Sequence, residues 1–169
     1  MEEQTNTTTT RAGLRYGLIF GLISVISMLI KYMAHLEKIF SLFDWTYFII
    51  MVVMALLYYR SNNNGLMTYG QGVSTGMAAT GVASIIRAFG HLIYISFIDK
   101  DYTRRQLDLL RIELEKNPDI SDEQINQMLS MGSSAPTLAF LGMIFGLLLL
   151  GLVISLIVAA ILKKENKEF

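Results

Sequence analysis

Cysteine is absent from this sequence of 169 residues, and histidine occurs only twice, at positions 35 and 91. Without cysteine the chain can form no disulfide, no thiolate metal site and no thiol nucleophile. The histidines and carboxylates show no zinc-like spacing, and the H-E-x-x-H motif is missing. We therefore expect no metal ion and no cofactor, and we interpret His35 as an interfacial residue rather than a ligand.

Charge is also scarce in this chain. Only 17% of the residues are charged and 53% are hydrophobic, whereas soluble domains carry about 25% charged residues. Fourteen basic and fourteen acidic residues give a net charge of zero, which does not favour nucleic-acid binding. The charges lie in short connectors between long uncharged runs, which is the pattern of an integral membrane protein.

The uncharged runs predict an all-α fold, an integral membrane bundle of four transmembrane helices. A helix needs about 20 residues to cross the hydrocarbon core of a bilayer. The last run has no charge over its entire length, and the first gains length because Arg15 and Lys31 can snorkel from its two ends. We place the spans at residues 14–33, 42–59, 72–98 and 137–162, inside a single membrane domain of residues 13–163.

Both ends of the chain are polar. Residues 1–12 are rich in threonine, and we expect them to form a disordered tail. No small-residue cleavage site follows the first apolar run, so we interpret this run as an uncleaved span and not as a signal peptide. Residues 164–169 form a basic tail. Basic residues are almost evenly divided between the two predicted sides, so the positive-inside rule leaves the orientation open.

Residues 99–136 are expected to leave the membrane as a helical hairpin between the third and fourth spans. Pro118 interrupts the helical pattern, and Ser121 with Gln124 predicts a capping box at the start of the second helix. The first helix is amphipathic, with leucines at helical spacing and opposite charges four residues apart. Its leucines are Leu107, Leu110 and Leu114, and its predicted ion pairs are Arg104/Asp108 and Arg111/Glu115.

Small residues recur at four-residue spacing in the first, third and fourth spans. Such a stripe lies on one face of a helix and lets a neighbouring helix approach closely. We expect helix packing at these positions, which are Gly13, Gly17, Gly21, Gly72, Gly76, Gly142 and Gly146.

The third span carries Arg87 near its middle and His91 one helical turn later. A charge at that depth costs about 2.5–3.5 kcal/mol on insertion scales. Arg87 is therefore either part of an anion site or proton relay, or a structural residue that ties helices together or snorkels toward the hairpin side. Counting residues from the hairpin side places Arg87 level with Ser24. The same count places His91 at the same depth as Ser27 and Tyr47. The candidate intramembrane polar site is therefore Arg87, His91, Ser84, Ser24, Ser27 and Tyr47.

Residues 72–76 match the G-x-S-x-G pattern of serine hydrolases. Ser74 and His91 would lie about 25 Å apart along one helix, because each residue adds 1.5 Å. A serine and its catalytic base must approach to about 3 Å. We therefore interpret this motif as small residues at a helix interface and expect no catalytic residue.

Several short motifs follow one another in a defined order. They are Tyr-Gly-Gln-Gly at 69–72, Ile-Asp-x-x-Tyr at 98–102, and Ser-Leu-Ile-Val-Ala-Ala-Ile-Leu-Lys-Lys at 155–164. Together with the glycine-rich first span, they resemble a domain-of-unknown-function family, numbered four-one-nine-nine, of small bacterial four-span membrane proteins. The resemblance implies a multi-pass protein of the bacterial cytoplasmic membrane with four spans. It implies no catalytic or binding residues.

These observations lead to two expectations about function. The first is a non-enzymatic accessory or oligomerising membrane protein, in contact with the lipid bilayer and with a second copy or another membrane protein as partner. The alternative is a small transporter or channel that uses the Arg87/His91 face of the third span. No nucleic-acid partner is expected.

Overall fold

The computed structural model describes residues 7–34, 37–133 and 136–165, without the side chains of 37–45, 132–133 and 136–139. Over these residues the chain is helical, and its extended pairing consists of a single β-bridge. One π-helical turn, Tyr94–Ile98, continues the third long helix. The helices are α1 (Thr9–Met33), α2 (Glu37–Ser61), α3 (Tyr69–Ile93), α4 (Tyr102–Leu114), α5 (Asp122–Ser133) and α6 (Pro136–Leu162).

Three described segments are long and apolar enough to cross a membrane, namely Thr9–Met33, Tyr69–Ile98 and Phe140–Leu162. In α2 the described apolar stretch is the shorter segment Thr46–Ser61. Apart from one β-bridge, the regular structure of the described residues is thus helical, and it includes three helices with the length and composition of membrane spans.

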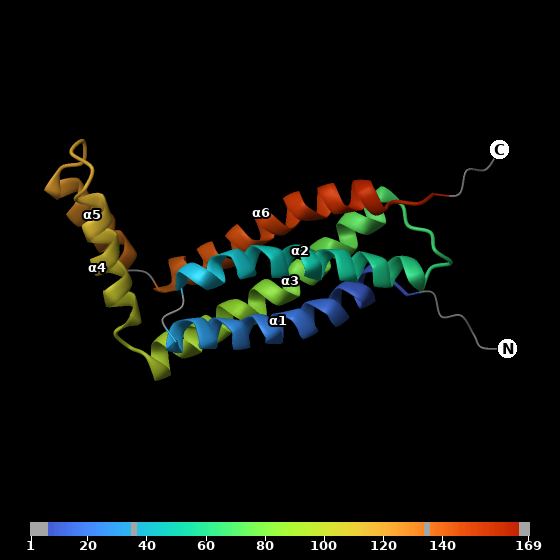
Figure 1. Ribbon diagram of the computed structural model, residues 1–169, viewed down its shortest axis with the longest axis horizontal. Helices are drawn as coiled ribbons and strands as arrows, with labels where there is room; N and C mark the ends of the chain where they lie inside the picture. Colours follow the sequence, from blue (N-terminus) through green and yellow to red (C-terminus); the bar gives the residue numbers. More distant parts are fainter. Residues whose placement is uncertain (1–6, 35–36, 134–135, 166–169) are drawn as a thin grey trace. The chain divides into compact units, whose positions relative to one another are not determined.

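The chain folds as two units. The first contains the chain up to Arg87 and from Ile144 onwards, and the second is Ala88–Met143. In the first unit the larger parts of the four long helices lie side by side (Figure 1).

Helices α1 and α2 run antiparallel. The Tyr16 ring lies 5.3 Å from that of Tyr58, near the end of α2, and the Phe20 ring lies 5.3 Å from that of Tyr47, near its beginning. Arg15 Nη1 donates a hydrogen bond of 2.7 Å to the Tyr58 hydroxyl. Aromatic packing and this hydrogen bond therefore join the two helices.

Helices α1 and α3 run parallel and touch through the glycine stripe of α1. A Cβ on Gly17 would lie 2.7 Å from the Ala79 carbonyl oxygen, and one on Gly21 would lie 2.8 Å from Ile86 Cδ1. Gly13 precedes them on the same face and is also fully packed against α3. Because lipid tails are as apolar as leucine, such close packing holds spans together where hydrophobic burial cannot.

Helices α3 and α6 run antiparallel, and their contact alternates small residues between the two sides. Moving four residues forward along α3 brings the contact to a residue four positions earlier in α6. At each step, a Cβ added to the glycine would overlap the side chain opposite. The contacts, in order along α3, are Gly72 with Ala159, Gly76 with Ser155, and Thr80 with Gly151.

In the last span, the glycine that packs against a neighbouring helix differs from the two that were expected, Gly142 and Gly146. A Cβ on Gly142 or Gly146 would find no described atom within 4 Å, and both residues are exposed. The glycine of α6 that packs inside the unit is Gly151, which is not one of the predicted packing positions. Facing Thr80, it continues the register begun by the two preceding contacts.

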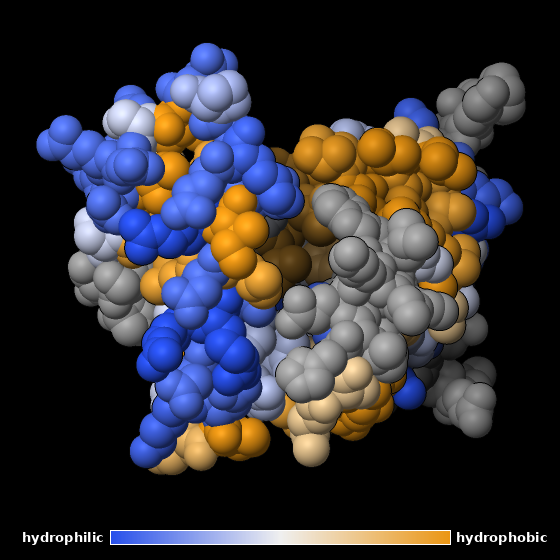
Figure 2. Space-filling model, turned by 60° about the vertical axis from the view of Figure 1, so that its left-hand side comes forward, coloured by the Kyte–Doolittle hydropathy of each residue, from blue (hydrophilic) through white to orange (hydrophobic). Residues whose placement is uncertain are grey.

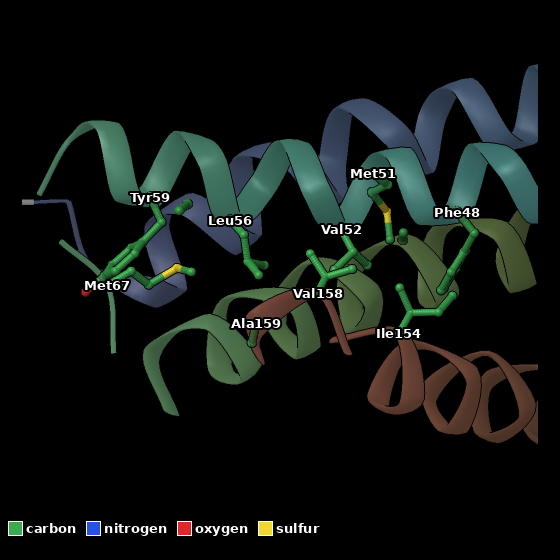
Figure 3. Close-up of a cluster of buried hydrophobic side chains, with 11 residues drawn as sticks. Phe48, Met51, Val52, Leu56, Tyr59, Met67, Ile154, Val158 and Ala159 are labelled. Atoms are coloured by element: carbon green, nitrogen blue, oxygen red, sulfur yellow. The ribbon is translucent and has the colours of Figure 1, made fainter. Parts of the chain in front are cut away.

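An apolar core fills the space between α2 and α6. Met51, Val52 and Leu56 of α2 are fully buried, and Ile154 and Val158 of α6 point toward them (Figure 3). Each deletion of a large side chain here would leave a void that the surrounding helices fill only in part.

Backbone pairing and caps close the bundle at the end where α1 begins. Met67 and Lys164 exchange two backbone hydrogen bonds of 2.8 Å, so Lys164 belongs to an ordered contact and not to a free tail. Arg60 donates to the Leu162 carbonyl at 3.3 Å, where the last carbonyls of α6 lack helical partners. Thr8 caps α1 by accepting from the Arg11 amide at 3.1 Å, which starts the helix at Thr9.

That cap corrects one expectation about the N-terminal tail. Residues 9–12 are helical, whereas we assigned them to a disordered segment of residues 1–12. Threonine is a good N-cap residue, and this local hydrogen bond outweighs the polar composition. Residues 1–6 and 166–169, the outer parts of the two expected tails, lie outside the described residues.

The hairpin of the second unit shows two of its predicted local interactions. Ser121 and Gln124 form the capping box, with reciprocal hydrogen bonds of 3.0 and 3.3 Å. Arg111 Nε pairs with Glu115 Oε1 at 3.1 Å. The predicted Arg104/Asp108 ion pair was wrong, because no such pair forms there. Arg111 and Glu115 have the same basic-to-acidic order, so the difference lies in the acid, because the aspartate side chain is one methylene shorter than that of glutamate.

Candidate functional site

Four polar residues of the first unit line a small cavity between the helices. Its volume is about 10 Å³, and its polar lining comes from three helices. Phe48, Met51, Ala83 and Leu147 complete the wall, so apolar side chains make up the rest of the lining. The polar lining residues are Ser24 of α1, Tyr47 of α2, and Ser84 and Arg87 of α3.

Hydroxyl groups of the cavity are held by the backbone. Ser24 Oγ donates to the Gly21 carbonyl at 2.7 Å, and Ser84 Oγ donates to the Gly81 carbonyl at 2.9 Å. The Tyr47 hydroxyl donates to the carbonyl of Phe20 on the neighbouring helix. Once their protons are committed in this way, serine oxygens retain lone pairs for an incoming donor.

The structure brings four of the six predicted polar residues together. Ser24, Tyr47, Ser84 and Arg87 line the cavity, and Ser24 and Ser84 are almost completely buried. Ser27 is partly exposed and is not part of the lining. His91 belongs to the second unit.

The size of the cavity limits its chemistry. A volume near 10–15 Å³ accommodates a single water molecule, which needs two to four polar partners. The lining offers serine oxygens as acceptors and the half-buried Arg87 guanidinium as a donor. The arrangement suits a buried bridge between helices and has no room for a solute.

A second polar cluster lies at the end of the α3 segment, in the second unit. Asp99 accepts hydrogen bonds from the Tyr94 hydroxyl, at 3.2 Å, and from the Arg105 guanidinium, with which it also forms an ion pair. The Tyr102 ring packs edge-on against those of His91 and Tyr94, with centroids 5.8 Å apart in both cases. These contacts fix the connection between the π-helical turn and α4.

We call His91, Tyr94, Asp99, Tyr102 and Arg105 the exit cluster. Its electrostatics are dominated by the ion pair between Asp99 and Arg105. The hydrogen bond from Arg105 holds the pKa of the Asp99 carboxyl below its ordinary value, and the positive charge acts in the same direction. The carboxylate in turn raises the pKa of the Arg105 guanidinium. Asp99 and Tyr102 are the Asp and Tyr of the Ile-Asp-x-x-Tyr motif, so the motif marked this cluster, whereas Arg105 had no signal of its own.

Two buried hydroxyls at the contact between α3 and α6 lie outside the predicted polar site. Thr80 Oγ1 and Ser155 Oγ are both inaccessible to solvent and have no hydrogen-bond partner among the described residues. By contrast, Thr75 Oγ1 donates to the Gln71 carbonyl at 2.8 Å. The tight glycine contacts hold these hydroxyls in place.

The hydrolase-like motif occupies a helix interface. Gly72 and Gly76 pack against α6, and Ser74 is exposed, with its Oγ 3.4 Å from Thr9 Oγ1. Within the described residues, no group of three or more histidine or acidic side chains is arranged to hold a metal ion.

A family model with the description "Protein of unknown function (DUF4199)" matches residues 15–164. The chain belongs to this family. The resemblance drawn from the sequence motifs is thereby confirmed, and the match includes the cavity, the exit cluster and the hairpin. Comparisons with curated proteins and with solved structures found no match.

Proposed function

We propose that this DUF4199 protein is a four-span protein of the bacterial cytoplasmic membrane that acts without enzymatic chemistry, through helix contacts with a partner. The four-span layout is supported by helix direction. Helices α1 and α3 are parallel and both long enough to cross, so the chain must return between them. That return falls to α2, whose 25 residues extend about 37 Å, more than the roughly 30 Å of a hydrocarbon core.

The observation that carries the proposal is the pair Gly142 and Gly146 on α6. The glycines of the α1–α3 and α3–α6 contacts are used inside the unit, but these two have open space where a side chain would be. Two glycines four residues apart let a second helix approach closely enough for backbone contacts. Exposed Leu149 and Val153 continue this face by helical spacing. The partner that fits is the same face of α6 in a second copy.

The Gly146→Leu variant tests this proposal, because a leucine would fill the open space without touching the interior. The protein is reconstituted in lipid nanodiscs or dilute vesicles, and subunits are counted by single-molecule photobleaching. We expect the wild type to count as an oligomer and the variant as a monomer. Gly70→Leu is the matched control, since Gly70 is also an open helical glycine but lies in the first turn of α3. Equal subunit counts for wild type and Gly146→Leu would contradict the proposal.

The transporter alternative receives less support from the geometry. The small and polar face of α3 is covered by other helices, since Thr75, Thr80 and Ser84 are inaccessible to solvent. The cavity beside Arg87 has room for one water molecule. We therefore assign Arg87 a structural role, as a polar tie between α1, α2 and α3.

A further inference from the structure

The helical hairpin of the second unit carries a groove of about 470 Å³ on its surface. This volume lies in the range of small-molecule sites. Basic side chains line it on α4 and just before it, and Leu107 and Leu129 supply apolar surface between them. On the face shown in Figure 2, hydrophilic side chains dominate the hairpin, with hydrophobic ones between them. The groove is therefore amphipathic and positively charged.

Two of its cations are available for a ligand. Lys100 and Arg104 are exposed, and neither forms an ion pair with a residue that the structure describes. Asp108 is the acidic residue of the lining, but it pairs with neither of them. Arg111 is engaged by Glu115 at 3.1 Å and by Asn126 at 2.7 Å. Asp99, which directly precedes Lys100 in the sequence, pairs with Arg105 instead.

The position of these cations along the chain places them at a membrane surface. Lys100 comes two residues after Ile98, the last residue of the Tyr69–Ile98 candidate span. Phe97 and Ile98 are 79% and 60% exposed, as expected of side chains that face lipid. The exit cluster then fixes the first turn of α4 through Asp99. Phospholipid phosphates occupy this interfacial level, directly outside the hydrocarbon core.

We propose that this groove binds the headgroup of an anionic phospholipid. Lys100 and Arg104 bind the phosphate, Arg104 through two parallel N–H donors, and the two leucines contact the glycerol and the first acyl carbons. A phosphodiester supplies the negative charge that the two cations lack, and its chains supply apolar surface. A free phosphate would use the cations but leave the leucines without a partner.

The test compares lipid binding by single-charge variants of the full-length protein. Wild type, Arg104→Gln and Lys116→Gln are purified in a mild detergent and titrated with phosphatidylglycerol or phosphatidylcholine, and bound lipid is counted by native mass spectrometry. Lys116 is the matched control, because it is a basic residue of the same hairpin outside the groove lining, paired with Glu113 at 2.8 Å. We expect Arg104→Gln to weaken phosphatidylglycerol binding about fivefold, the effect of one interfacial cation, and Lys116→Gln to leave it unchanged.

Further measurements separate the alternatives. Adding Lys100→Gln to Arg104→Gln should raise the loss to about 25-fold, and Arg104→Lys should restore part of the binding. Helix content by circular dichroism must match the wild type for each variant compared. The proposal is overturned if Lys116→Gln weakens binding as much as Arg104→Gln, or if phosphatidylcholine binds as tightly as phosphatidylglycerol. Displacement of the lipid by millimolar inorganic phosphate would also overturn it, because the ligand would then be the free anion.

Discussion

Replacing Thr80 by valine should stabilise the bundle, although Thr80 is completely buried at a tight helix contact. Its hydroxyl has no hydrogen-bond partner among the described residues, and a buried polar group in that state costs about 1–3 kcal/mol. Valine keeps the branched shape of threonine and exchanges the hydroxyl for a methyl group. Gly151 opposite supplies the space that the branched side chain needs. We therefore expect a gain of about 1 kcal/mol in the free energy of unfolding.

Thr75→Val is the matched control for this prediction. Thr75 is also fully buried on α3, but its hydroxyl donates to the Gln71 carbonyl at 2.8 Å. The same substitution there removes a hydrogen bond worth about 0.5–1.5 kcal/mol, so its sign should be opposite.

The assay is reversible unfolding in mixed micelles, in which sodium dodecyl sulfate is titrated against a mild detergent and helix content is followed. Thr80→Val should shift the transition to a higher mole fraction of the denaturing detergent, and Thr75→Val to a lower one. A loss of stability in both variants would refute the reasoning, because it would mean that the Thr80 hydroxyl has a partner. Thr80→Ser then serves as a check, since it keeps the hydroxyl and should lose stability by losing the methyl contact with Gly151.

Two further predictions concern the exit cluster and the polar cavity. Arg105 lowers the pKa of the Asp99 carboxyl. Their ion pair therefore stabilises the connection between the π-helical turn and α4 at pH values above the ordinary carboxyl pKa of about 4, and this stabilisation is lost as the pH falls through the lower pKa of the folded state. Protection of the amides around the start of α4, measured relative to their intrinsic exchange rate at each pH, should therefore decrease only in acid. Asp99→Asn should lower this protection at neutral pH as well, and equal protection in both proteins at pH 7 would contradict the prediction. Because the chain has no native cysteine, a single Ser84→Cys variant can report on hydration of the cavity. We expect a membrane-impermeant thiol reagent to leave position 84 unlabelled and to label a Leu110→Cys control in permeabilised cells, and labelling at 84 would restore the transporter alternative.

The packing of α3 explains why this helix organises the first unit. It meets α1 through glycines of α1, and it meets α6 through contacts that alternate glycine between the two helices. Gly76 also lies against Val52 of α2, so all three neighbours touch α3. A helix surrounded in this way tolerates few larger residues, and any polar residue on it must find partners inside the bundle.

Local features of the chain could be predicted from the sequence because they depend on spacing along one helix. The capping box of Ser121 and Gln124 and the Arg111–Glu115 pair follow from residues three and four apart. Helix rise is constant, so counting residues predicted that Ser24 and Arg87 lie at the same depth; both residues line the cavity.

The direction in which each helix faces its neighbours was decided only by the tertiary structure. Gly72 and Gly142 both begin four-residue glycine repeats in the sequence, yet the first repeat packs inside the unit and the second has open space. Serines 24 and 27 differ by less than one turn, yet only the former reaches the cavity. The sequence by itself determined the long helices, the capping box of α5 and the family. Rotation of the helices about their axes then selected which glycines are buried, the four polar residues of the cavity and the two groove cations that form no ion pair with a described residue. That rotation follows from side chains of several helices fitting together at once, whereas periodicity within one helix marks a face without showing which neighbour it meets.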